Sequence, residues 1–187
     1  MIRIIAFISI VFCYNSIEAQ IIKVYVNPFH VRGIVPLGFG GKIENKLNLK
    51  NSLELTGGIY YRESMFSEHG AYVGYNFSLA SKHYFKPNEL YDGFYLSPSI
   101  NYLKADISYI GLTQSEFIKG TRNGFGVNIS GGFQKIIKHR FSIEAALGIC
   151  YYRNNEKVEF ANQQNWDSWS GSLEPNLTLN VGWVIKK

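Results

Sequence analysis

Over most of its length the sequence alternates between apolar residues and small or polar ones, and this period of two is what most limits its fold. The clearest stretch runs from Gly124 to Gln134, and two later stretches, from Phe141 and from Ser172, repeat it. Successive side chains of a β-strand point to opposite faces. Each stretch therefore predicts a strand with one apolar face and one polar face.

Eight segments of this kind follow one another, with no linker, charge run or low-complexity insert between them. The predicted strands cover residues 22–31, 36–47, 52–62, 70–85, 92–105, 122–135, 140–153 and 169–185. The composition agrees with an all-β chain, because 16% of the 187 residues are aromatic and 18 are glycine. Only 18% are charged, below the roughly 25% of an ordinary soluble domain. A single domain of eight antiparallel strands is predicted.

The first 19 residues do not share the alternation. Arg3 precedes a mostly apolar run from Ile4 to Cys13, and a more polar stretch ends at Ala19. This order predicts a signal peptide, residues 1–19, which is cleaved to leave residues 20–187 as one barrel domain. Cys150 is then the single cysteine of the mature chain, so an internal disulfide is excluded.

The alternation alone fits two kinds of barrel. A soluble, secreted, lipocalin-like barrel would enclose a ligand with its apolar faces, whereas a membrane barrel turns them to the lipid. The polar faces of the three clearest strands carry mostly Gly, Ser, Asn and Thr, and their apolar faces carry no charge. Small polar residues suit the narrow lumen of eight strands. We therefore predict an eight-stranded antiparallel up-and-down transmembrane β-barrel, with the soluble ligand-binding barrel as the alternative.

Connection lengths and aromatic positions agree with the membrane prediction. If both termini lie on the inner side, two of the outer loops, residues 106–121 and 154–168, are long and the inner turns are short, as in bacterial outer-membrane barrels. Aromatic residues gather near strand ends, where the two membrane interfaces would place them. The predicted interface aromatics are Tyr61, Tyr102, Tyr151, Phe133, Phe141 and Trp183.

The eight segments, the leader and the aromatic end of the last strand together resemble the small outer-membrane β-barrel proteins of Gram-negative bacteria, the OmpA/OmpX-like class. The resemblance covers about residues 22 to 185. It implies a porin-like barrel in the outer membrane, surrounded by outer-membrane lipids. The sequence departs from the class at its end, because Trp183 is followed by Val184, Ile185 and two lysines, where such chains commonly finish on Phe or Trp.

Several charged residues fall on the inward face of the predicted strands. Three lysines and three glutamates share the lower half of the barrel, with Lys42 and Glu174 nearer the middle and Arg62 near the top. Charges buried in this way must be paired, so we predict a structural ion-pair network that fills the lumen, with a catalytic carboxylate site or a narrow ion path as the alternatives. The predicted network comprises Lys23, Lys42, Glu44, Lys46, Glu54, Arg62, Lys82, Glu144 and Glu174.

The sequence contains no complete phosphate-binding loop and no metal-spaced His/Cys cluster, so neither a cofactor nor a metal site is predicted. Some small outer-membrane barrels modify lipid A with a Ser, a His and a carboxylate, and the candidate here is His69 with Ser67 and Glu68. We expect these three to be ordinary loop residues, with a lipid A-modifying enzyme as the less favoured alternative.

No folded basic stripe points to nucleic acid. Basic residues instead gather near the predicted periplasmic rim, where they would meet lipid headgroups or a periplasmic protein. These residues are Lys135, Lys138, His139, Arg140, Lys186 and Lys187. The outer loops are the other predicted place for a protein partner. The function predicted from the sequence is that of a non-enzymatic barrel with a structural, surface-interaction or accessory-subunit role.

Overall fold

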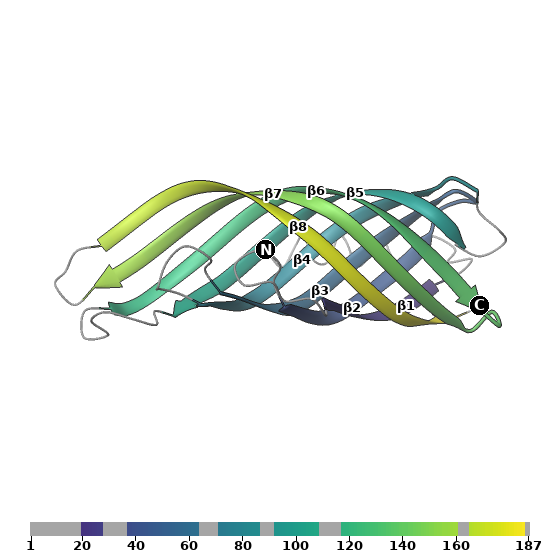
Figure 1. Ribbon diagram of the computed structural model, residues 1–187, viewed down its shortest axis with the longest axis horizontal. Coiled ribbons are helices and arrows are strands. Elements are labelled where there is room, and N and C mark those ends of the chain that lie inside the picture. Colours follow the sequence, from purple (N-terminus) through teal and green to yellow (C-terminus); the bar gives the residue numbers. More distant parts are fainter. Residues whose placement is uncertain are drawn as a thin grey trace.

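The computed structural model describes residues 20–27, 37–63, 71–86, 92–108, 117–160 and 165–185. Within them the chain forms eight antiparallel strands that neighbour one another in chain order and close into a barrel (Figure 1). The strands are β1 Gln20–Asn27, β2 Leu37–Lys46, β3 Asn51–Glu63, β4 Ala71–Tyr84, β5 Gly93–Ser108, β6 Phe117–Ile137, β7 Phe141–Phe160 and β8 Asn165–Ile185. The predicted eight-stranded all-β fold is confirmed. The predicted leader, residues 1–19, lies outside the described residues.

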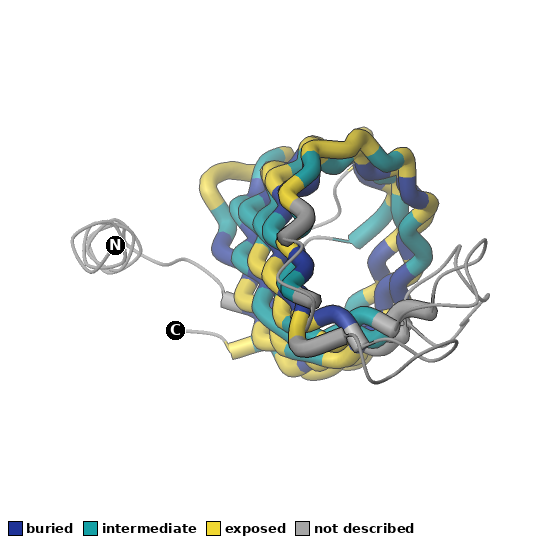
Figure 2. Tube along the Cα trace, turned by 90° about the vertical axis from the view of Figure 1, so that its left-hand side faces the viewer, coloured by how far each residue is buried: buried dark blue, intermediate teal, exposed yellow. Residues whose placement is uncertain are grey.

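The two faces of the wall follow the alternation of the sequence. In the view along the barrel, buried and exposed residues alternate along each strand around a closed ring (Figure 2). From Phe141 to Cys150 every second residue of β7 is exposed and the ones between are buried. The exposed set is apolar, as in Leu147 at 65% exposure and Val127 of β6 at 61%. The barrel is thus apolar outside and polar inside, which inverts the arrangement of a soluble protein.

The barrel has two unlike ends. The turn end carries the tight connections from β2 to β3 and from β6 to β7, and the loop end carries the opposite ends of the same strands. In the first turn the Asn48 side-chain oxygen accepts hydrogen bonds from the backbone of Lys50 and Asn51, both at 2.9 Å. In the second, Lys138 and His139 have positive φ angles of 50° and 55°, as in the turns that match the twist of a hairpin.

Two predicted loops are shorter than expected, because the last four strands continue past the predicted boundaries at the loop end. The predicted loop 106–121 is wrong, since β5 runs to Ser108 and β6 begins at Phe117. The predicted loop 154–168 is also wrong, since β7 and β8 leave only residues 161–164 between them. The part of the barrel where these strands project is called the extension below. It comprises residues 103–108, 117–124, 153–160 and 165–170.

The extension was missed because its two faces exchange character. On β5, Leu103, Ala105 and Ile107 are buried inside, while Lys104 and Asp106 are exposed outside. The apolar outward pattern that reveals the lower part of each strand therefore ends here. Backbone pairing nevertheless continues, as between Ile107 and Gly120.

The closing seam between β1 and β8 is short. The paired residues are Gln20 to Val26 on β1 and Ile185 to Leu179 on β8. The next residue after β1 is Pro28, which has no N–H to donate to the seam, and the rest of the predicted strand 22–31 lies outside the described residues. Among the described residues, β8 is therefore paired only to β7 along its outer half.

The same seam explains a proline inside β8. The backbone N–H of Val184 donates to the carbonyl oxygen of Arg140 on the β7 side at 2.8 Å. Alternate residues of a strand direct their backbone N–H and C=O groups to opposite sides. Pro175 is an odd number of residues from Val184, so its backbone groups point away from β7, to the side where β8 has no described partner at that level. Proline is tolerated in a strand where no neighbour needs its N–H.

We predict that Gly40 is required for close strand packing, whereas its neighbour Gly41 is not. A Cβ on Gly40 would lie 2.3 Å from the carbonyl oxygen of Gly57 and 2.6 Å from Cα of Gly58, both backbone atoms. A Cβ on Gly41 would have its nearest neighbour at 3.8 Å. Gly40→Ala should lower the free energy of unfolding by about 1–3 kcal/mol through overpacking.

The measurement is a urea titration of the refolded protein, followed by the mobility difference between unheated and heated samples on a gel. Gly41→Ala is the matched control and should leave the midpoint unchanged. Equal midpoints for the two variants would contradict the assignment.

Candidate functional site

Six charged side chains meet inside the barrel near its turn end and form what we call the inner cluster. They come from five strands, which the closed ring brings around the same part of the lumen. All six residues are buried, with exposures of 8% or less. The members are Lys23 on β1, Lys42 and Glu44 on β2, Glu54 on β3, Lys82 on β4 and Glu144 on β7.

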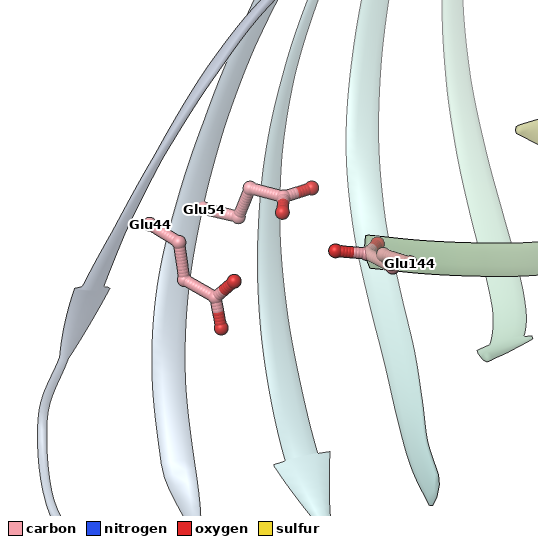
Figure 3. Close-up of side chains that lie close together, drawn as sticks. All are labelled: Glu44, Glu54 and Glu144. Atoms are coloured by element: carbon pink, nitrogen blue, oxygen red, sulfur yellow. The ribbon is translucent and has the colours of Figure 1, made fainter. Parts of the chain in front are cut away.

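Three carboxylates of the inner cluster point toward one another (Figure 3). Glu44 and Glu54 are direct register partners on β2 and β3, a position where like charges repel. Oxygens of Glu44, Glu54 and Glu144 all lie within 4.8 Å of one another. Such a group is stable only with cations between its members.

Two lysines supply those cations. Lys23 Nζ contacts Glu44 and Glu144, and reaches Glu54 Oε2 at 3.2 Å. Lys82 Nζ lies 3.3, 2.6 and 2.8 Å from carboxylate oxygens of Glu44, Glu54 and Glu144. Each ammonium group therefore contacts all three carboxylates.

Lys42 completes the charge balance, with Nζ 3.1 Å from Glu54 Oε1. The inner cluster then holds three positive and three negative groups and is formally neutral.

Neutral side chains take up further hydrogen-bonding capacity around the inner cluster. The Tyr84 and Ser52 hydroxyls donate to Glu44 at 2.7 and 2.5 Å, and Tyr95 donates to Glu144 at 2.6 Å. Gln134 accepts a hydrogen bond from Lys23 at 2.6 Å. Buried ions need such partners in addition to opposite charge.

Three clustered glutamates are also the ligand type that divalent cations use. Here the facing oxygens already contact two ammonium groups, at distances typical of ion pairs. The cluster thus carries its own counter-ions, and its chemistry is that of an ion-pair network.

A second group of charges, the outer cluster, lies inside the wall toward the loop end. Arg122 on β6 contacts Glu174 at 3.2 Å and Glu156 at 3.6 Å. It also donates to the Ser172 hydroxyl at 3.2 Å, and its guanidinium lies 5.1 Å from the ring centroid of Tyr72. One strong cation is thus held by two carboxylates and an aromatic face.

Between the clusters the lumen contains a cavity of about 120 Å³. Its lining is mainly hydroxyl and amide groups, including Thr56, Asn76, Ser99, Asn101 and Asn128. Buried Cys150 lies at its side and accepts a 3.5 Å contact from Asn101 Nδ2. A polar cavity of this size has room for ordered water molecules.

The structure brings most of the sequence-predicted lumenal residues together, in two groups. Lys23, Lys42, Glu44, Glu54, Lys82 and Glu144 form the inner cluster, and Glu174 belongs to the outer one. Lys46 is half-buried at the turn end. The side chain of Arg62 lies outside the described residues, as do Ser67, Glu68 and His69.

Arg122 and Glu156 of the outer cluster are not among the predicted lumenal residues. A signal for Arg122 was present, because it continues the inward parity of Gly124 to Gln134 by two residues. Arg122 is the first residue of the predicted strand 122–135. Its register partner on β7, Glu156, falls in the predicted loop 154–168, so no inward partner for Arg122 was expected.

The predicted interface aromatics lie on the outer wall near both ends. Phe133, Phe141 and Trp183 are 40–54% exposed toward the turn end, with the Phe141 and Trp183 rings 5.9 Å apart. Tyr61, Tyr102 and Tyr151 lie toward the loop end, where Tyr151 is exposed and the other two are partly buried. Tyr102 also packs against Phe125, with ring centroids 5.0 Å apart.

Comparison with known proteins agrees with this architecture. The sequence model of the family described as "Protein of unknown function (DUF3575)" matches residues 5–176. The chain belongs to this family. No curated protein matches the sequence.

Among solved structures, the N-terminal β-barrel domain of OprF from Pseudomonas aeruginosa is similar, with a TM-score of 0.52. The match covers 90% of this chain and 98% of the OprF chain at 16% sequence identity. At that identity the likeness shows the fold, which is that of an OmpA-like eight-stranded barrel.

We predict that Lys23 is essential to the stability of the inner cluster. Lys23→Gln should lower the free energy of unfolding by about 3–5 kcal/mol, because it leaves buried carboxylates short of a counter-ion. The matched control is Lys135→Gln, which removes an exposed lysine 2.6 Å from Asp92 and should change stability by no more than about 1 kcal/mol.

The measurement is again the urea midpoint of the folded form. Adding Glu144→Gln to Lys23→Gln should restore part of the loss, since one negative charge leaves with the positive one. A Lys23→Gln midpoint equal to that of Lys135→Gln would refute the role.

Proposed function

We propose that this protein is a non-enzymatic outer-membrane β-barrel with a filled lumen. It acts as a structural, surface-interaction or accessory subunit through its rims and outer loops. In this proposal residues 1–19 are a cleaved signal peptide, the turn end faces the periplasm and the loop end faces outward. Outer-membrane lipids surround the wall.

The observation that carries the proposal is the uncharged outward belt. On β5 it runs from Phe94 to Tyr102 and on β6 from Phe125 to Phe133, nine residues in each case. This is the length with which a tilted strand crosses the hydrocarbon of a bilayer. Aromatic residues mark both edges of the belt, as the interfaces of a membrane barrel require.

The side chains that fill the lumen argue against an open channel. The inner cluster joins side chains from five strands across the barrel, and the outer cluster occupies the wall toward the other end. A role at the surface is then the function that the architecture favours. Lys138 and Arg140 on the turn-end rim are exposed and suit anionic headgroups or a periplasmic protein.

The alternatives explain less. A soluble ligand-binding barrel would need an apolar interior and a polar exterior, the reverse of this wall. An enzyme acting on lipid A would need a histidine beside a nucleophile. Among the described histidines, His83 instead contacts Asn51 at 2.8 Å and lies against Phe85 with ring centroids 6.0 Å apart. Neither neighbour is a nucleophile.

We predict that the purified protein gives no large, steady conductance in a planar lipid bilayer at 0.15 M salt, because paired side chains cross the lumen. Insertion is checked in the same preparation by protease protection. A steady conductance from inserted protein would overturn the filled-lumen proposal, and a changed lipid A acyl pattern in cells that carry the protein would overturn its non-enzymatic part.

We also predict a strong effect of a charge in the middle of the belt. Leu147→Arg should destabilise the protein in vesicles by about 2–4 kcal/mol, the value for an arginine at mid-membrane. Thr121→Arg, on the outward face of the extension, is the control and should stay within about 0.5 kcal/mol of wild type. Equal unfolding midpoints, together with recovery of the protein in the supernatant after fractionation, would favour a soluble barrel.

A further inference from the structure

Two exposed cations stand directly above the outward belt at the loop end. Lys104 on β5 is two residues beyond Tyr102, and Arg153 on β7 is two residues beyond Tyr151. Both side chains are on the outward face, where the belt gives way to the polar surface of the extension. In a membrane this is the level of the outer headgroups.

These cations differ from the other outward cations on the strands. Lys119 pairs with Glu159 at 3.2 Å, Lys157 with Asp167 at 3.3 Å and Lys135 with Asp92 at 2.6 Å. Within the described part of the chain, no acidic group lies within 4.0 Å of Lys104 or Arg153. Asp106 is the next outward residue after Lys104 on β5, and no ion pair joins the two.

The outward acids Glu159 and Asp167 thus pair with cations higher up, and the cations nearest the belt keep their charge available. Arg153 is held in place by an aromatic neighbour, with its guanidinium 5.2 Å from the ring centroid of Trp169. Trp169 is itself 64% exposed. This contact fixes the direction of the guanidinium without neutralising it.

The strand register sets the spacing of the two cations. Lys104 is opposite Asn123, and Arg153 is opposite Phe125, the next outward residue of β6. The cations therefore lie two strands apart and are offset by two residues along the strands, about 12 Å between their Cα atoms, on either side of an amide and an aromatic ring. This spacing suits two phosphates at opposite ends of a disaccharide.

We propose that Lys104 and Arg153 form a binding surface for the phosphates of an outer-leaflet phosphoglycolipid. Asn123 lies between them as a further hydrogen-bonding group, and the acyl chains lie along Phe125 and Val127 below. Arginine and lysine are the side chains that bind phosphate most strongly. The proposal rests on the proposed outer-membrane location with the loop end outward.

The test uses the full mature chain in phosphatidylcholine vesicles that contain a small fraction of bisphosphorylated lipid A. Bound lipid is measured by native mass spectrometry after extraction with a mild detergent. The double variant K104Q/R153Q should retain lipid A at least tenfold less than wild type. Lipid A without its phosphates should be retained equally poorly by both proteins.

The matched control is K119Q/K157Q, which removes two outward cations that already have acidic partners, and it should retain lipid A as wild type does. The charge-preserving variant K104R/R153K should also keep binding. With the wild-type protein alone, raising the salt from 0.1 M to 1 M should weaken retention, because salt screens exposed charges.

Insertion into vesicles without lipid A, measured by protease protection, separates this proposal from the one it rests on. Wild type that inserts but holds phosphorylated and phosphate-free lipid A equally, or a K104Q/R153Q variant that retains lipid A fully, overturns the binding surface alone. Wild type that does not insert overturns both proposals.

Discussion

The narrowness of an eight-stranded ring is the constraint on which the rest of this structure depends. Its lumen has room for side chains and little else, so every inward residue shares a small space with residues from several other strands. Charges placed there lose most of their hydration and must balance one another. The inner cluster does this with three charges of each sign, and glycines such as Gly40 and Gly58 make room where the Tyr25 ring crosses the lumen.

The outer wall obeys a second constraint, which changes along the barrel. In the belt the outward residues are uncharged and mostly apolar, whereas in the extension they include Lys104, Asp106, Lys119 and Glu159. The inward face changes in step, from polar lumenal residues to Leu103, Ala105 and Ile107. A single strand such as β5 thus follows two opposite patterning rules, and the change between Tyr102 and Lys104 marks the edge of the belt.

The strand count, their order and the inward position of most charged residues could be predicted from the sequence, because outward and lumen-facing residues differ at every step in the belt. The extension could not, since Lys119 and Thr121 read as loop residues when their environment is unknown. Pairing partners were also beyond reach. That Lys23 contacts Glu144, 121 positions away, depends on ring closure and register, which no local pattern encodes.

The place of Lys23 in the chain has a consequence for how the barrel assembles. Lys23 belongs to β1, the strand that closes the ring against β8, while the carboxylates it contacts come from β2, β3 and β7. Until the first strand docks, those three carboxylates share Lys82 and Lys42 and the lumen carries an excess negative charge. Docking of the first strand therefore completes the backbone ring and neutralises the interior in one event.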